Sequence, residues 1–421
     1  MADALAREIK RRRDEAGLSQ RALATRIGYS RQYVSMTEWE DANLPSSELV
    51  AALDKALGAG GALTALRAEI TTSRRTTELV GPGTPASIPW DERSSRQRSP
   101  AITQLCAVLT DYGASHYRPV PSRPRQIPSV ESLERDLEVA FIAYQHSHLA
   151  AAASRCAVLL PDAQSVSRHC EEIERPRAYR LLAMAYQCTA SVLAKASEVD
   201  AAWIASERGL NASDVADSPS VRGSLIRSVA FALLSSGRLE PAMSLVDSGV
   251  ESLAAEVPEN DSVLSVYGTL LLVGSIAAAR FGDRARTLDY LDKASNAAQC
   301  LGKDANHLWT AFGPTNVAIH RVNTAAELGD FKTALDSTIN VNSAPLERRT
   351  RYLLDIARAH CLGGNRADAL STLLMAERIA PEQVRQHYLS RKVVIALVRS
   401  KMDGPVELDR LARRVNALES I

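Results

Sequence analysis

The stretch LSQRALATRIGYSRQYVS, residues 18–35, predicts two short helices joined by a tight turn. Ser19 can cap a helix over residues 20–27, in which the apolar side chains recur at helical spacing. A Gly-Tyr dipeptide ends that helix, and Ser30 can cap the next one, over residues 31–39. The polar side chains that follow Ser30 then stand at the exposed start of the second helix.

The flanking segments complete a small helical domain over residues 1–70. Further helices are predicted over residues 4–15, from Pro45 onward, and over residues 62–70, because each segment carries apolar residues on one face. Together with the two helices of the central stretch they make a five-helix domain.

This pattern resembles the helix-turn-helix domain of the phage-repressor-like (XRE) regulators, roughly over residues 4–70. The Leu-Ser-Gln start, the glycine turn and the serine-capped third helix carry the resemblance, and GAGGALTAL at residues 58–66 is similar to actinobacterial members. The resemblance implies a third helix that enters the major groove of double-stranded DNA.

The candidate DNA-binding residues gather around the third helix. Arg31 can bond a guanine edge twice and Gln32 an adenine edge, while Ser35 lies one turn further along the same face. The resemblance places a phosphate contact at Gln20, at the start of the second helix. The full predicted set is Arg12, Gln20, Arg21, Ser30, Arg31, Gln32 and Ser35.

Charge is unevenly distributed within this domain. Residues 1–35 hold eight basic and four acidic residues, whereas residues 36–70 hold two basic and six acidic ones, so the basic half contains the third helix. The resemblance also implies a partly buried structural ion pair between Arg13 and Glu38. Met36 and the acidic loop after Glu38 depart from the family pattern and would weaken DNA binding.

A second region, residues 71–128, reads as a proline-rich linker with one or two short helices. Eight of the 18 prolines fall between residues 82 and 128. Within it, residues 102–112 predict an isolated helix.

Residues 129–421 predict an α-solenoid. A small residue followed by a polar one recurs between amphipathic helices, and we expect the small residue to let the paired helices approach closely. These turns are Ala196-Ser197, Gly237-Arg238, Gly282-Asp283, Gly329-Asp330 and Gly364-Asn365. The last two, in GDFKTAL and GGNRADAL with Pro381 closing the last pair, resemble tetratricopeptide repeats. An ordinary antiparallel helical bundle is the alternative to a solenoid.

The resemblance to tetratricopeptide repeats implies a concave groove lined by the first helix of each pair. Counting back from each turn residue selects the inner face of that helix. The predicted groove residues are Tyr186, Arg227, Asn316, Asn323, Arg351 and Arg358. Their amide and guanidinium groups could hold a peptide, small-molecule or small-protein effector.

Composition excludes several other classes of protein. The 421 residues carry a net charge of +1, and the six cysteines form no CxxC pair. The first residues lack the apolar core of a secretion signal, and the longest apolar run, at 270–279, is too short to span a bilayer, so we expect a cytoplasmic protein. No catalytic motif is present, so no enzyme activity, cofactor or metal is predicted.

Two functions remain open at this point. The first is an all-α, ligand-controlled transcription regulator that binds DNA as a homodimer. The second is a protein-interaction scaffold, or an antitoxin-like partner binder, with a degenerate helix-turn-helix.

Overall fold

The computed structural model separates into two compact units, the first built on residues 1–97 and the second on most of residues 98–421. The residues that it describes are 2–27, 34–35, 37–38, 45, 47–69, 99–111, 127–257, 260–399 and 406–417. Over these ranges every regular element is a helix, apart from a single bridge between Ala305 and Phe312. The predicted all-α class is therefore confirmed.

The first unit packs short amphipathic helices around one small core. Its helices are α1 (Ala2–Glu15), α2 (Gln20–Ile27), α4 (Ser47–Ala56) and a further helix over residues 62–69. Their buried apolar side chains include Leu5, Ile9, Leu23, Leu49, Leu53 and Leu63. Most of the predicted third helix lies outside the described residues, but Val34 and Thr37 from it are buried.

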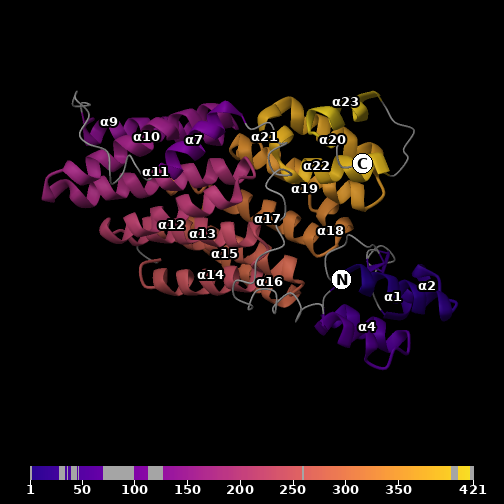
Figure 1. The fold of residues 1–421 in the computed structure, drawn as a ribbon. Helices are drawn as coiled ribbons and strands as arrows, with labels where there is room; N and C mark the ends of the chain where they lie inside the picture. The colour runs from indigo at the N-terminus through magenta and orange to yellow at the C-terminus, as the bar shows by residue number, and fades with distance from the viewer. Residues whose placement is uncertain are drawn as a thin grey trace, which may run out of the picture. The chain divides into compact units, whose positions relative to one another are not determined.

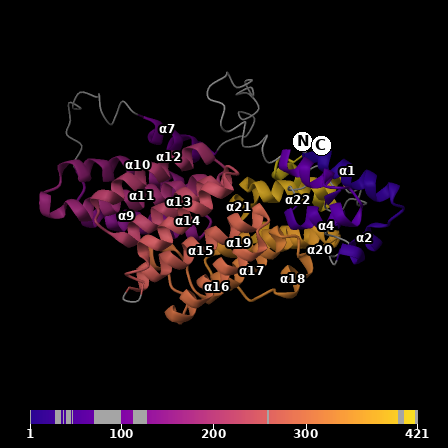
Figure 2. The same ribbon diagram turned by 90° about the horizontal axis from the view of Figure 1, so that it is seen from below.

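The second unit is a succession of antiparallel helices (Figures 1 and 2). In chain order its longer helices are α7 (Pro100–Thr110), α9 (Val130–Gln145), α10 (Leu149–His169), α11 (Arg175–Lys195), α12 (Val199–Val215), α13 (Pro219–Ser235), α14 (Leu239–Leu253), α15 (Asp261–Phe281), α16 (Arg284–Leu301), α17 (Pro314–Glu327), α19 (Leu346–Leu362), α20 (Arg366–Ile379), α22 (Tyr388–Arg399) and α23 (Val406–Arg414). Shorter helices are η1 (Glu172–Glu174), η2 (His307–Trp309), α18 (Phe331–Asp336) and α21 (Pro381–Gln386).

These helices bury three successive apolar cores. The first core is formed by α7 together with helices α9 through α12. The second is formed by helices α13 through α17, and the third by helices α19 through α23. Helix α13 contributes to both the first and the second core. A chain of cores in which each helix packs mainly on its sequence neighbours is compatible with a solenoid.

Helix α7 corrects the prediction of an isolated helix within a linker. Its buried side chains Ile102, Leu105 and Leu109 join the first core, and Figure 1 shows α7 lying beside α10. The proline-rich segments on either side of α7 suggested that this helix is isolated. Its three apolar residues at helical spacing instead pack it against the first core.

Each of the five predicted turns joins two consecutive helices. The structure adds two turns of the same kind, at Ser147 between α9 and α10 and at Asp217 between α12 and α13. Both residues adopt positive φ, 60° for Ser147 and 45° for Asp217. The sequence analysis missed these turns, because nothing in the sequence shows that Ser147 and Asp217 adopt positive φ.

The turn glycines are explained by backbone conformation and not by close helix approach. Gly237 has a φ of 79°, and a Cβ atom added there would meet nothing within 4 Å. The amide of Gly237 bonds the Leu234 carbonyl, and the next amide bonds that of Leu233, which is the usual left-handed ending of a helix. Close approach occurs instead at mid-helix glycines such as Gly209 and Gly268.

Helix α15 also differs from the sequence expectation. With 21 residues it is the one helix in the described parts of the chain that is long and apolar enough to cross a membrane. However, 89% of its apolar window is buried inside the second unit. Its apolar character is thus accounted for by core packing.

Candidate nucleic-acid interface and interior cavity

Arg13 and Glu38 come together in the first unit, where the resemblance had placed an ion pair. Arg13 Nε lies 2.5 Å from Glu38 Oε1, and Nη2 lies 2.9 Å from Oε2. The side chains are 11% and 4% exposed. The bond with Glu38 raises the pKa of Arg13 above its ordinary value. The pair links α1 to the segment that follows Val34.

Gln20 joins this pair as a third member. Its side-chain amide donates to Glu38 Oε2 over 2.9 Å, so α2 is tied to the same carboxylate as α1. To make the phosphate contact that the resemblance implied, the side-chain amide of Gln20 would have to leave Glu38 and bind a phosphate instead. The bond to Glu38 was missed by sequence reasoning, because residues 18 positions apart show no local pattern.

Thr37 shows how the domain accommodates a polar residue in its core. The side chain is 4% exposed, and its hydroxyl donates to the Val34 carbonyl over 2.7 Å. A buried hydroxyl that is hydrogen-bonded within its own helix costs little. Its presence is thus consistent with an intact core.

The remaining DNA-binding candidates differ in their surroundings. Arg12 lies beside Glu8, with Nε 2.7 Å from Oε1, whereas the side chain of Arg21 is exposed. Ser35 is half-buried. Three other candidates, Ser30, Arg31 and Gln32, lie outside the described residues.

Pairing within α1 reduces the positive field of the basic half. Glu8 accepts from both Arg11 and Arg12, and these bonds lower its pKa to about 2. Arg11 also pairs with Glu15. Cations that are already paired to carboxylates on their own helix attract phosphates less strongly.

Asp54 is a structural residue that the sequence analysis did not single out. Its carboxylate accepts from the amides of Gly61, Leu63 and Thr64 over 2.7, 2.8 and 3.2 Å, and so caps the helix over residues 62–69. Burial opposes ionisation, but these amide donors outweigh it and hold the pKa of Asp54 below its ordinary value. The sequence analysis missed this cap, because Asp54 lies seven or more residues before the amides that it accepts from.

In the second unit, Tyr186 does not line a groove. It is 5% exposed, and its hydroxyl accepts from the Gln164 amide on α10 over 2.7 Å. That prediction was counted from Ala196, whereas Ser197, with a φ of 63°, occupies the turn place that Gly237 holds in its own turn. Counting back from Ser197 selects Gln187, whose amide approaches the Leu308 carbonyl at 3.4 Å.

Arg227 belongs to a buried cluster of charges. Lys195 Nζ lies 2.8 Å from Glu347 Oε2, and Arg348 Nε lies 2.9 Å from Glu347 Oε1. Burial, together with repulsion from Arg348, lowers the pKa of Arg227 to about 10. Three cations therefore surround one carboxylate, and Arg227 Nε has no hydrogen-bond partner among the described residues.

The predicted groove residues of α19 lie on the same side of that helix. Arg351 pairs with Asp355 at 3.1 Å and lies 3.2 Å from His387 Nε2. Arg358 is half-buried two turns further along. On α17, Asn316 and Asn323 are 3% and 4% exposed.

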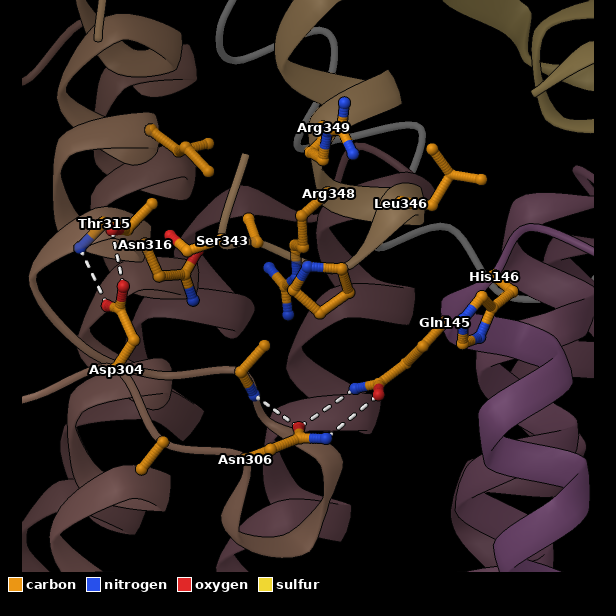
Figure 3. Close-up of a pocket in the computed structure, with 15 residues that line it drawn as sticks. Gln145, His146, Asp304, Asn306, Thr315, Asn316, Ser343, Leu346, Arg348 and Arg349 are labelled. Carbon is orange, nitrogen blue, oxygen red and sulfur yellow. Dashed lines mark hydrogen bonds between the residues drawn. The ribbon is translucent and has the colours of Figure 1, made fainter. Parts of the chain in front are cut away.

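A cavity of about 490 Å³ lies beside this charged cluster. It is lined by the end of α9, by residues 304–306 with Ala311, by Thr315, Asn316 and Ile319 of α17, and by residues 343–346 with Arg348 and Arg349. Figure 3 shows Asn316 of α17 and Arg348 of α19 among the side chains that line it, with the amides of Gln145 and Asn306 paired at its edge. Of the six groove candidates, only Asn316 lines this cavity directly.

The loop that closes the cavity is held by contacts to α9 and α15. Trp309 stacks on Phe141 of α9 with ring centroids 5.0 Å apart, and Asn306 exchanges two 3.0 Å bonds with Gln145. Phe312 is fully buried against Gly268 of α15. These contacts maintain positive φ at residues 308, 309 and 311.

Comparison with known proteins identifies the first unit. Residues 4–66 match the family model described as a helix-turn-helix domain. The comparison with curated proteins returned no match. Among solved structures, BtubC (BKLC) from P. vanneervenii is similar to this chain, with 14% identity, coverage of 59% of this chain and 91% of that chain, and a TM-score of 0.35.

Proposed function

We propose that this chain is a transcription regulator of the XRE type. Its helix-turn-helix domain reads operator DNA, and its tetratricopeptide-like domain senses an effector. The observation that carries the proposal is the match of residues 4–66 to a helix-turn-helix domain. The Arg13–Glu38–Gln20 network supports it, because two helices are braced on a carboxylate that belongs to the predicted reading helix. A rigid mount of this kind keeps base-reading side chains in register.

A regulator of this kind acts as a homodimer in the cytoplasm, without an enzymatic step. Two reading helices about 34–36 Å apart would match half-sites on successive turns of DNA. The operator would then be an approximate palindrome.

The experiment is a salt-dependent gel shift with the full chain on DNA upstream of its own gene. Arg31→Ala should weaken binding by about 1–3 kcal/mol, with Gln32→Ala also weakening it, because each removes a predicted base contact. Binding should weaken steeply as salt rises. Lys55→Ala, an exposed cation on α4 within the acidic half of the domain, is the matched control and should bind like the wild type.

A second candidate, a protein-interaction scaffold or antitoxin-like binder, is favoured by one observation. Arg11 and Arg12 are paired with carboxylates on α1, which lowers the positive field of the domain. A scaffold would show no shift even at low salt, or a shift that Arg31→Ala and Gln32→Ala leave unchanged. Either result would reject the regulator in favour of the scaffold.

A further inference from the structure

The cavity of the second unit contains a buried amide that has no partner. Asn316 is 3% exposed, yet neither Oδ1 nor Nδ2 forms a hydrogen bond within the described chain. Buried side-chain amides almost always form hydrogen bonds. A donor and an acceptor left without partners on one side chain therefore indicate a place for another molecule. Figure 3 shows this side chain directed into the cavity and not toward Asp304, which is engaged by Thr315.

The positive charge beside the cavity exceeds the negative charge. Lys195, Arg227 and Arg348 lie around Glu347, and the charge of each lowers the pKa of this carboxylate. Arg348 Nε is close enough to Glu347 for an ion pair but is not aligned for a hydrogen bond. Excess positive charge that is partly shielded from water is costly, and an anion would offset that cost.

Two further features favour an anion over a neutral ligand or a cation. Arg349 lines the cavity next to Arg348, and both belong to the first turn of α19, whose N-terminus carries the positive end of the helix dipole. The carboxylate that lines the cavity, Asp304, already accepts two bonds from Thr315. A cation would therefore meet guanidinium groups and no free carboxylate among these lining residues.

We propose that this cavity binds a small molecule bearing a carboxylate or phosphate group. Arg348 and Arg349 pair with the anion, and the Asn316 side chain donates to it. A volume of about 490 Å³ falls within the usual range for small-molecule sites. This inference rests on the proposed function in one respect, since it names the chemistry of the effector.

The test measures thermal unfolding of the full chain in the absence of DNA. Sodium phosphate and sodium succinate are each compared with sodium chloride at equal ionic strength. At about ten times its dissociation constant, a bound anion should raise the unfolding midpoint by about 3 °C. A larger shift with phosphate identifies a phosphate site, and a larger shift with succinate identifies a carboxylate site.

Variants separate specific binding from a general salt effect. Arg349→Gln and Asn316→Leu should abolish the shift, whereas Arg378→Gln, an exposed arginine on α20, should retain it. Isothermal titration calorimetry on the same proteins reports binding directly if a variant changes the unfolding transition. The proposal is overturned if neither anion shifts the wild type, or if all variants shift equally. Because no DNA is present, either failure is distinct from a failure of operator binding.

Discussion

The carboxylate of Glu347 lies between Lys195 and Arg348, 2.8 Å from Nζ of the lysine and 2.9 Å from Nε of the arginine. Burial opposes ionisation of Glu347, but the charge of Lys195, followed by that of Arg348, lowers its pKa below the ordinary value. This carboxylate thus stays ionised and joins α11 to α19 across the second unit.

Glu347→Gln should lower the free energy of unfolding by about 3–5 kcal/mol, because it removes the buried carboxylate that balances the half-buried cations Lys195 and Arg348. Urea denaturation at neutral pH measures the loss. Glu251→Gln, an exposed carboxylate on α14, is the control and should change stability little. Equal losses in the two variants would contradict a buried ionised role for Glu347.

His320 should make stability depend on pH. Burial, aided by repulsion from Arg348 and Arg351 and opposed by Glu347, lowers its pKa from 6.5 to about 3. Below pH 6.5 the unfolded chain binds a proton at this residue and the folded chain does not, so stability falls as pH falls. The loss should reach about 2 kcal/mol at pH 5.

Comparison with His320→Gln isolates that effect from the other titrating groups. In the folded chain His320 Nδ1 lies 2.8 Å from the Asn316 carbonyl, and a glutamine amide can donate in its place. Chemical denaturation at pH 7 and pH 5 should show a smaller pH-dependent loss in the variant. An unchanged difference would mean that His320 protonates in the folded state.

The sequence was sufficient for the elements that depend on local pattern. Helix α2 begins at Gln20 and ends at Ile27 as predicted, and all five small-residue turns join helices. The cavity was not predictable in the same way, because Gln145, Asn306 and Arg348 come from distant segments that no periodicity relates. The choice of Tyr186 depended on counting from Ala196, because the sequence does not show that the neighbouring Ser197 adopts positive φ.

Arg13→Met should destabilise the helix-turn-helix domain by about 3–5 kcal/mol, since it leaves Glu38 buried with only the Gln20 amide. The double variant Arg13→Met/Glu38→Leu should recover most of that loss, because no buried charge is then left unpaired. Hydrogen exchange of residues 2–27 in the full chain measures both changes. Arg11→Met, which removes an exposed pair, is the control and should leave exchange unaltered. A double variant no more protected than the single one would contradict the argument.

Gly268→Ala should disrupt the loop that closes the cavity. A Cβ atom at this position would lie 2.0 Å from Cζ of Phe312, which is fully buried. Overpacking of this kind costs about 1–3 kcal/mol or more, and the displaced loop should also weaken anion binding. Gly302→Ala, where nothing lies within 4 Å but φ is 72°, should cost only about 1 kcal/mol of backbone strain.

A double-mutant cycle with Phe312→Leu tests whether the contact itself is responsible. Leucine is smaller than phenylalanine, so it leaves room for the new methyl group. In urea denaturation, the double variant should therefore lose less free energy of unfolding than the two single variants lose together. The same non-additivity should appear in the anion-induced shift of the unfolding midpoint, because Ala311, next to Phe312, lines the cavity. Strictly additive losses would show that Gly268 and Phe312 act independently, and would remove the link between α15 and the cavity.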